Sequence, residues 1–261
     1  MLVMAAFVAA QQQPSAPRSG WPCTGRLDPS YFRVAEGSGG HLLLLAPDEI
    51  ADSASLFLAF TSHPQTIFRL AGSVTPGLHD FQVPIDPSVE SVLFSVSVQC
   101  LESAYILDPS GALAGGDAVT YRSTFRAERM VIVRQPQPGM WTVRVAGSGV
   151  AGVTVQAKSP LGIGDIEFSA AGSTAFKPLP AFGVENTARL RIGRIAQPRA
   201  SQVSGVGEPV GSLPLSPGET EGTYLSRFQP DGGGFRVMVV GRDEQGFDIQ
   251  RMYAPLFAPL R

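Results

Sequence analysis

The stretch that most constrains the fold is residues 128–145, which read ERMVIVRQPQPGMWTVRV. Two runs rich in β-branched and aromatic residues lie on either side of a Pro-Gln-Pro-Gly turn. The second run, WTVRV, alternates apolar with polar side chains, and this period of two indicates a strand with one buried face. Similar units of run, turn and run recur along most of the chain. The sequence therefore predicts a mainly β architecture.

Composition agrees with this architecture. The 261 residues include 29 glycines and 22 prolines, which fall between apolar runs, and 44% of the residues are apolar. That apolar content is enough to form buried cores, and the length suits two domains of about 100 residues each. The formal net charge is -2. We therefore expect no nucleic-acid partner and no electrostatic attraction to an anionic membrane.

The first half of the chain predicts one helix and seven short strands. HLLLLA at 41–46 is typical of a strand buried on both faces, and the Pro-Asp-Glu that follows predicts a helix over about 47–60. Turns rich in Pro, Gly, Asp and Ser then separate the strand candidates. These lie at 66–73, 77–83, 92–99, 103–107, 129–134, 140–145 and 153–157. Their spacing is typical of a β-sandwich.

The second half predicts another set of strands after a break near 158–162. The candidates lie at 162–170, 187–195, 222–229, 235–241 and 246–253, and the last two form a hairpin across GRDEQG. The segment 204–222 carries few signals of regular structure. We expect a second sandwich from this half.

The N-terminus resembles a secretory leader. MLVMAAFVAA is a short apolar run before the polar, proline-containing QQQPSAPRSG, and we expect cleavage near Ala10. No later run reaches the ~18 apolar residues of a spanning helix, so no transmembrane segment is expected. The sequence thus predicts export to the periplasm, the cell surface or the extracellular space.

The chain has two cysteines, Cys23 and Cys100. An exported protein with an even number of cysteines usually pairs them, so we expect a disulfide between the two. The alternative is two free buried thiols. Two cysteines and three scattered histidines give no metal-ligand spacing, and no metal is expected.

No catalytic set is visible in the sequence. His41, His63 and His79 lie outside any known nucleophile or metal motif, and the last two read as loop residues. We therefore predict a protein that is not an enzyme and that uses no cofactor. Calcium is the one ion considered, because acids gather at 48–52 and 243–248, but the spacing of a calcium loop is absent.

Residues 120–129, TYRSTFRAER, form the candidate binding surface. Aromatic residues interleaved with arginine are common anchors of recognition surfaces, and we predict a long loop here. The predicted binding residues are Tyr121, Arg122, Phe125, Arg126 and Arg129. The alternative is that the aromatic side chains fold back onto the sandwich.

The order of several motifs is similar to that of a known family. VPIDPSVESVLFSVSVQC at 83–100, ILDPSGAL at 106–113, the 128–145 stretch and GFRVMVVGRDEQGFDIQRMYAPLF at 234–257 carry the resemblance. The chain resembles the segment of hemicentin-like proteins that follows their von Willebrand factor A domain. Cys23, the segment to residue 49 and the helix to Phe60 match the end of that A domain, with a short helix, a Gly-Gly turn, a strand and a final helix.

The resemblance covers roughly residues 21–257. It implies a galactose-binding-like or jelly-roll β-sandwich, then an Ig-like or fibronectin-like sandwich, with a short α/β segment before them. The expected divisions are 1–20 for leader and linker, 21–61, 62–158 and 159–261. The body of the A domain and its Asp-x-Ser-x-Ser motif are missing, so the resemblance implies no metal-dependent adhesion and transfers no ligand residue.

These observations favour an exported, non-catalytic recognition or adhesion module that binds a protein or glycan at the cell envelope. One alternative is a structural or assembly subunit of the envelope that acts by self-association through exposed edge strands. Another is a carbohydrate-binding accessory domain.

Overall fold

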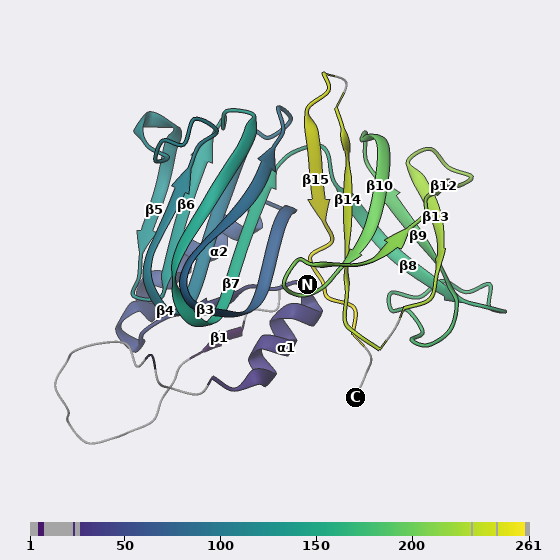
Figure 1. The fold of residues 1–261 in the computed structure, drawn as a ribbon, viewed down its shortest axis with the longest axis horizontal. Coiled ribbons are helices and arrows are strands. Elements are labelled where there is room, and N and C mark those ends of the chain that lie inside the picture. Colours follow the sequence, from purple (N-terminus) through teal and green to yellow (C-terminus); the bar gives the residue numbers. More distant parts are fainter. Residues whose placement is uncertain (1–4, 8–22, 24–26, 231, 244, 259–261) are drawn as a thin grey trace.

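The computed structural model describes residues 5–7, 23, 27–230, 232–243 and 245–258. Two β domains stand side by side, and the N-terminal helices lie against the first of them (Figure 1). The predicted fold class, mainly β with two sandwiches and a short α/β segment, is confirmed. Among the described residues, no helix combines the length and the apolar character needed to cross a bilayer.

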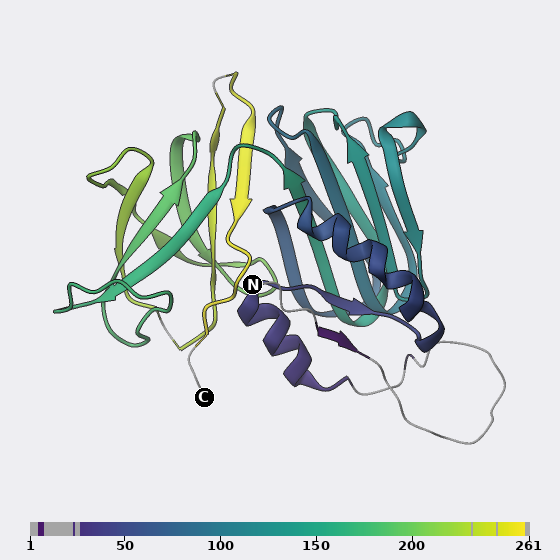
Figure 2. The same ribbon diagram turned by 180° about the vertical axis from the view of Figure 1, so that it is seen from behind.

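The N-terminal segment is a small α/β unit. The short strand β1 (Ala5–Phe7) pairs in parallel with β2 (Leu42–Leu44), and helix α1 (Pro29–Ser38) lies between them in sequence. The predicted helix at 47–60 is present as a 3₁₀ turn, Pro47–Ser53, followed by α2 (Ala54–Thr61). Figure 2 shows both helices on one face of the first domain. The expected leader cleavage near Ala10 lies outside the described residues.

Helix α1 begins and ends on residues with clear roles. The carboxylate of Asp28 accepts a hydrogen bond from the backbone N of Ser30 at 2.8 Å, and Pro29 fills the first turn, where a missing N–H costs nothing. The helix ends at Gly39, whose φ of 71° is left-handed. A Cβ at Gly39 would lie 2.9 Å from the backbone N of Pro255, so the close approach of the C-terminal segment also requires glycine.

The first domain is a five-stranded antiparallel sheet in the order β3-β7-β4-β6-β5. The strands are β3 (Gln65–Ile85), β4 (Ser91–Leu107), β5 (Val119–Thr124), β6 (Glu128–Arg134) and β7 (Gly139–Lys158), and a 3₁₀ turn, Gly116–Ala118, precedes β5. The prediction of seven short strands is wrong here. Three pairs of predicted strands are instead three long continuous strands, and register shifts mark the places where turns were expected.

The long strands bend so that the sheet folds over on itself. Phe94 pairs with Val155, whereas Trp141 pairs with Val83 at the other end of the same strands. Even so, the rings of Phe94 and Trp141 stack with centroids 5.5 Å apart. The two halves of each long strand must therefore face each other across one core, and β-bulges supply the bends. A single sheet forms both layers of this sandwich.

The second domain packs two four-stranded sheets face to face. One sheet has the order β11-β10-β14-β15 and the other β12-β13-β9-β8, and their inner faces share a core rich in phenylalanine. The strands are β8 (Ile163–Ala170), β9 (Asn186–Ile192), β10 (Ala196–Val203), β11 (Pro209–Leu213), β12 (Ser216–Pro217), β13 (Thr223–Phe228), β14 (Arg236–Arg242) and β15 (Asp248–Met252). The predicted last hairpin is confirmed.

Three strands of this domain were missed by the sequence analysis. β10 is polar along most of its length, and its Gln197 adopts a left-handed φ of 49° just before Pro198. β11 and β12 lie in the segment 204–222, where glycine and proline obscure any period of two.

A cluster of buried charges joins α1 to both domains. Glu36 of α1 accepts hydrogen bonds from Arg69 of β3, at 2.8 Å to Oε1, and from Arg236 of β14 at its other carboxylate oxygen. All three side chains are at most 4% exposed. Each guanidinium also donates to backbone carbonyls, so that no strong donor is left unsatisfied at this point. We call this set the Glu36 cluster.

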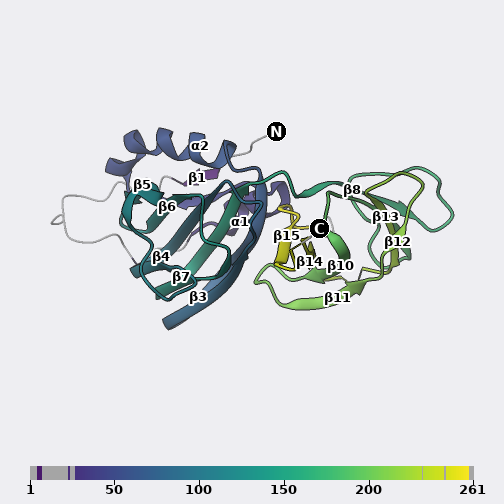
Figure 3. The ribbon, with the colours of Figure 1, turned by 90° about the horizontal axis from the view of Figure 1, so that it is seen from above.

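A second buried ion pair closes the junction between the domains. Arg251 of β15 donates to Asp86, 2.8 Å from Oδ2, and both side chains are at most 1% exposed. Its other nitrogens donate to the hydroxyl of Ser159 at 3.0 Å and the carbonyl of Leu161 at 2.9 Å. Seen from above, the first domain meets the second along β3 and β15 (Figure 3). The two buried sets of charges therefore fix how the domains sit against each other.

Candidate functional site

The five predicted binding residues lie on a β-hairpin and not on a long loop. Strands β5 and β6 pair from Val119 to Val133, which leaves only residues 125–127 as the turn. The loop prediction is therefore wrong. The residue pattern is ambiguous, because aromatic and basic residues alternate in an edge hairpin as well as in a recognition loop. In the hairpin they alternate because one face packs against the domain and the other faces solvent.

The two aromatic residues fold back onto the domain. Tyr121 and Phe125 pack against the apolar cluster that α2 and β2 form over the sheet, which includes Leu43, Phe60 and Met130. This is the arrangement expected from the alternative interpretation of the sequence. Both side chains are half-buried against this cluster and hold the hairpin under the helix.

Arg126 ties the hairpin turn to the start of the 3₁₀ segment. Its guanidinium makes two parallel hydrogen bonds to Asp48, at 2.6 and 2.7 Å, and its backbone N donates to Glu49 at 2.8 Å. Asp48 raises the pKa of Arg126. The side chains are about half exposed, so solvent weakens the attraction within the pair. Arg126 is thus already engaged within the protein.

Arg122 and Arg129 come together in a pocket. We call it the arginine pocket; its volume is about 200 Å³, and its walls come from β4, β5, β6 and the connection after β4. The lining residues are Ala104, Tyr105, Ile106, Leu113, Ala114, Arg122, Ser123, Arg129 and Val131. It lies where the end of β4 approaches the hairpin, at the open edge of the sandwich.

The hydrogen bonds that the two guanidinium groups make to described residues go to backbone carbonyls. Arg122 donates to the carbonyl of Ala114, and Arg129 donates to those of Phe125 and Glu128. Within the part of the chain that the structure describes, no carboxylate forms an ion pair with either arginine. Each guanidinium has five N–H donors, so several remain for a ligand.

The rim of the pocket adds apolar surface to its two guanidinium groups. The hydroxyl of Ser123, which is buried and has no hydrogen-bond partner, lies on the opposite face of the hairpin, because Ser123 pairs with Met130 of the cluster under α2 whereas Arg122 pairs with Val131. At the rim, Tyr105 is 47% and Leu113 is 54% exposed, so a ligand would also meet apolar surface. Sequence reasoning missed Tyr105 and Leu113, because only folding brings the end of β4 beside the hairpin.

The histidines serve the fold. His41 stacks on Phe60 with ring centroids 3.6 Å apart, and burial lowers its pKa to about 3. His63 is buried between the carbonyl of Ala59 and the hydroxyl of Ser91, at 2.7 and 2.9 Å. His79 lies within β3, so the prediction of loop positions is wrong for it.

The acidic candidates for calcium are occupied elsewhere. Asp48 and Glu49 bind Arg126, and Glu49 also accepts from the backbone N of Ala46 at 2.8 Å. Asp243 caps its own turn by accepting from the backbone N of Gln245 and Phe247. Among the described residues, no three His, Cys, Asp or Glu side chains gather as a metal site would require.

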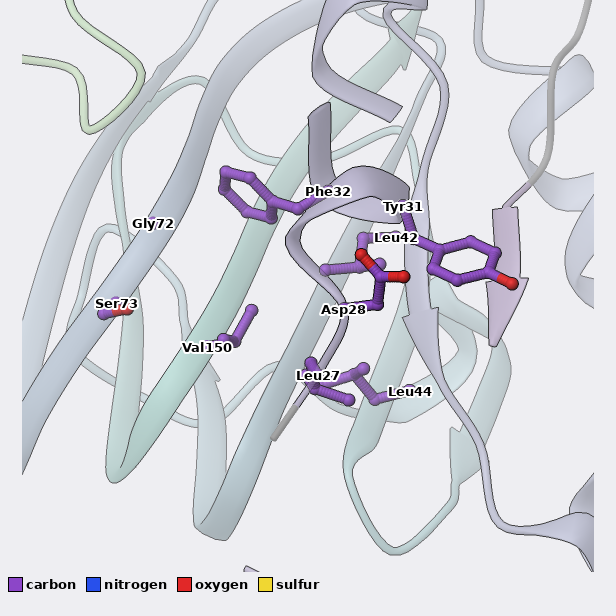
Figure 4. A pocket seen from close by; sticks show the side chains of 9 residues that line it. All are labelled: Leu27, Asp28, Tyr31, Phe32, Leu42, Leu44, Gly72, Ser73 and Val150. Carbon is purple, nitrogen blue, oxygen red and sulfur yellow. The ribbon is translucent and has the colours of Figure 1, made fainter. Parts of the chain in front are cut away.

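An apolar cavity lies beneath α1. It has a volume of about 210 Å³ and is bounded by Leu27, Tyr31 and Phe32 on the helix side, and by β2, β3 and β7 on the other (Figure 4). Its one carboxylate, Asp28, is held by Ser30, whose hydrogen bonds lower the pKa of Asp28. The lining holds no paired nucleophile and base, so we assign it no chemistry.

The two cysteines lie next to each other as free thiols. The Sγ of Cys100 is 3.4 Å from the carbonyl oxygen of Cys23, and burial together with the neighbouring Cys23 raises the pKa of Cys100. The disulfide therefore stays a prediction. We expect mild oxidation of the full chain to link them, which adds up to ~4 kcal/mol of stability in the loop-entropy model.

Mass spectrometry of a non-reducing digest checks this expectation. A peptide that joins Cys23 to Cys100 is the expected product, and the single variant Cys23→Ser is the control, since it leaves Cys100 open to maleimide. Recovery of both thiols unmodified after oxidation would count against the link.

Comparison with known proteins finds a family match within the first domain. Residues 68–160 match the family model of the hemicentin galactose-binding-like domain. The chain is 26% identical over 247 residues to hemicentin-1 of Mus musculus; the match covers 88% of this chain and 4% of that relative's length. A lipase of Bacillus licheniformis, in its propeptide form, aligns with 11% identity over 72% of this chain and 40% of its own, but with a TM-score of 0.36, which carries no argument.

Proposed function

Since residues 68–160 match the family model of the hemicentin galactose-binding-like domain, we propose that this chain is a non-catalytic recognition or adhesion module of the cell exterior. The relative that supports this is far longer than the chain, which spans 4% of it. What such a module binds must therefore be argued from the residues of this chain.

The arginine pocket is the observation that carries the proposal. Two guanidinium groups that form no ion pair with a described carboxylate line a space of about 200 Å³. An incoming carboxylate would accept from both arginines, and such charge-assisted hydrogen bonds are stronger than neutral ones. The small volume and the exposed Tyr105 and Leu113 favour an aspartate or glutamate side chain flanked by apolar residues. We propose an acidic segment of a protein as the partner.

Peptide binding to the full chain tests the proposal. The probes are capped peptides that carry one aspartate or glutamate between apolar residues, each compared with its asparagine or glutamine counterpart. We expect the acidic peptides to bind more tightly, and Arg122→Ala combined with Arg129→Ala to weaken binding by about tenfold or more, as for lost charged hydrogen bonds.

Arg134→Ala is the matched control. Arg134 lies on the same strand as Arg129 but outside the pocket, so its replacement should leave binding unchanged. Equal binding of acidic and amide peptides would overturn the proposed pocket. Binding of sulfated or uronic-acid polysaccharides, with no acidic peptide bound, would replace a protein partner by a glycan.

A further inference from the structure

A larger hollow lies on the outer face of the second domain. It has a volume of about 550 Å³ and lies over strands β8, β9 and β13, between Phe176 on one side and the connection from β12 to β13 on the other. These strands form the outer part of the second domain in Figure 1. The hollow belongs to a different domain from the arginine pocket and shares no residue with it. We call it the outer hollow.

One wall of the hollow is held in place by its own contacts. The guanidinium of Arg189 lies over the ring of Phe176, 4.0 Å from its centroid, and binds Glu167 on the neighbouring strand at 2.5 Å. The cation–π contact with Phe176 and the ion pair with Glu167 together hold the Arg189 side chain against the sheet. These three side chains are engaged with one another, and together they form one wall of the hollow.

The remaining charged groups of the hollow are not engaged. Arg191, Asp165 and Glu219 line it, and none of them forms an ion pair or a side-chain hydrogen bond with a described residue. Thr223 pairs with Arg191 in the sheet and adds a hydroxyl, while Leu225 supplies an apolar floor. The hollow thus presents free acceptors, free donors and an apolar patch within one space.

This combination of charged and apolar groups limits the classes of ligand that the hollow can bind. Three carboxylates and two guanidinium groups line the hollow when the Arg189–Glu167 pair is included. An anionic ligand would therefore meet more negative than positive charge. A metal cation would meet the guanidinium groups, and no metal-binding set exists among the described residues. A neutral ligand with several hydroxyls satisfies both kinds of group, because each hydroxyl donates to a carboxylate and accepts from a guanidinium.

We propose that the outer hollow is a binding site for a neutral saccharide. The sugar hydroxyls donate to Asp165 and Glu219 and accept from Arg191, and the C–H face of the ring lies on Leu225 and Phe176. The volume is within the range of small-molecule sites and accommodates one or two sugar rings. This site is independent of the acidic-peptide partner proposed for the first domain.

Titration of the full chain with neutral saccharides tests the proposal. The probes are methyl glycosides of the common hexoses and N-acetylhexosamines and their disaccharides, observed by saturation-transfer NMR and calorimetry. We expect at least one of them to bind, and Arg191→Ala and Asp165→Ala each to weaken that binding by about tenfold or more, as for the loss of a charged hydrogen bond.

Two controls separate this site from other effects. Arg227 is an exposed arginine on the same strand as Leu225 but does not line the hollow, so Arg227→Ala should bind saccharide as the parent chain does. Arg122→Ala, in the arginine pocket, should also leave saccharide binding unchanged. Absence of binding for every saccharide, binding that survives Arg191→Ala and Asp165→Ala, or binding of charged peptides alone at this site would overturn the proposal.

Discussion

Replacing Glu36 by glutamine is expected to lower the free energy of unfolding by about 3–5 kcal/mol, the cost of breaking a buried ion pair from one side. The carboxylate of Glu36 binds both Arg69 and Arg236 in the Glu36 cluster. Glutamine has nearly the same shape but no charge, so two guanidinium groups would remain buried without a counter-charge. Burial already lowers the pKa of Arg236 to about 10, and the attraction of Glu36 opposes that shift.

Denaturant unfolding of the parent chain and the variant measures this effect. The matched control is Glu90→Gln, which breaks the Lys158–Glu90 pair, whose side chains are 60% exposed. An exposed pair contributes only about 0–1 kcal/mol, so this control should unfold close to the parent. Equal midpoints for Glu36→Gln and Glu90→Gln would show that the cluster does not stabilise the junction.

The second large effect concerns Glu128, whose carboxyl group is completely buried under β2. Ser95 donates to its Oε1 at 2.8 Å, while Oε2 has no partner, and burial raises the pKa of Glu128 to about 8. The folded chain therefore holds a proton on Glu128 that the unfolded chain releases near pH 4.5. Stability from this group is complete below that pH and is lost as the pH rises towards 8.

Glu128→Gln is expected to remove this loss, because glutamine imitates the protonated acid. Between pH 7 and 9 the variant should be more stable than the parent, by a few kcal/mol at most on the pKa difference. Between pH 7 and 8, where the parent still loses stability, the stability of the variant should vary less with pH. His41 acts in the opposite sense, since its pKa of about 3 makes stability fall as the pH drops below 6.5. Measurements above pH 7 therefore isolate Glu128.

The control for this prediction is Glu102→Gln. Glu102 is exposed on β4, so its replacement should leave the parent's loss of stability above pH 7 in place. Parallel pH profiles for the parent and Glu128→Gln would mean that the buried carboxyl group is ionised in the folded chain.

The sequence predicted where β structure lies better than how far each strand continues. Thr-Pro-Gly at 75–77 reads as a turn, yet β3 runs through it with a register shift. A bulge and a turn use the same residues, and only pairing with β7 decides between them. In the same way, nothing local marks the polar β10 as a strand, because its place in the sheet comes from β14 and β11 on either side.

The candidate sites show the same division. Arg122 and Arg129 could be found from the sequence, since unpaired arginines near aromatic residues suggest recognition. The sequence does not distinguish these two arginines from Tyr121, Phe125 and Arg126. The latter three residues pack or pair within the protein, but their partners in α2 and at Asp48 lie far away in the chain. The Glu36 cluster gives no sequence signal at all, since its three members are isolated charged residues up to 200 positions apart.

The Glu36 cluster also has a consequence for the order in which the chain assembles. Helix α1 leaves the ribosome early, but one of the two arginines that neutralise Glu36 belongs to β14, near the end of the chain. During synthesis Arg69 of β3 is available to Glu36 first, and the second carboxylate oxygen gains its partner only when β14 is complete, so the final docking of the helix follows the completion of the last domain. Helix α1 is therefore synthesised early but reaches its native position late, when Arg236 pairs with Glu36.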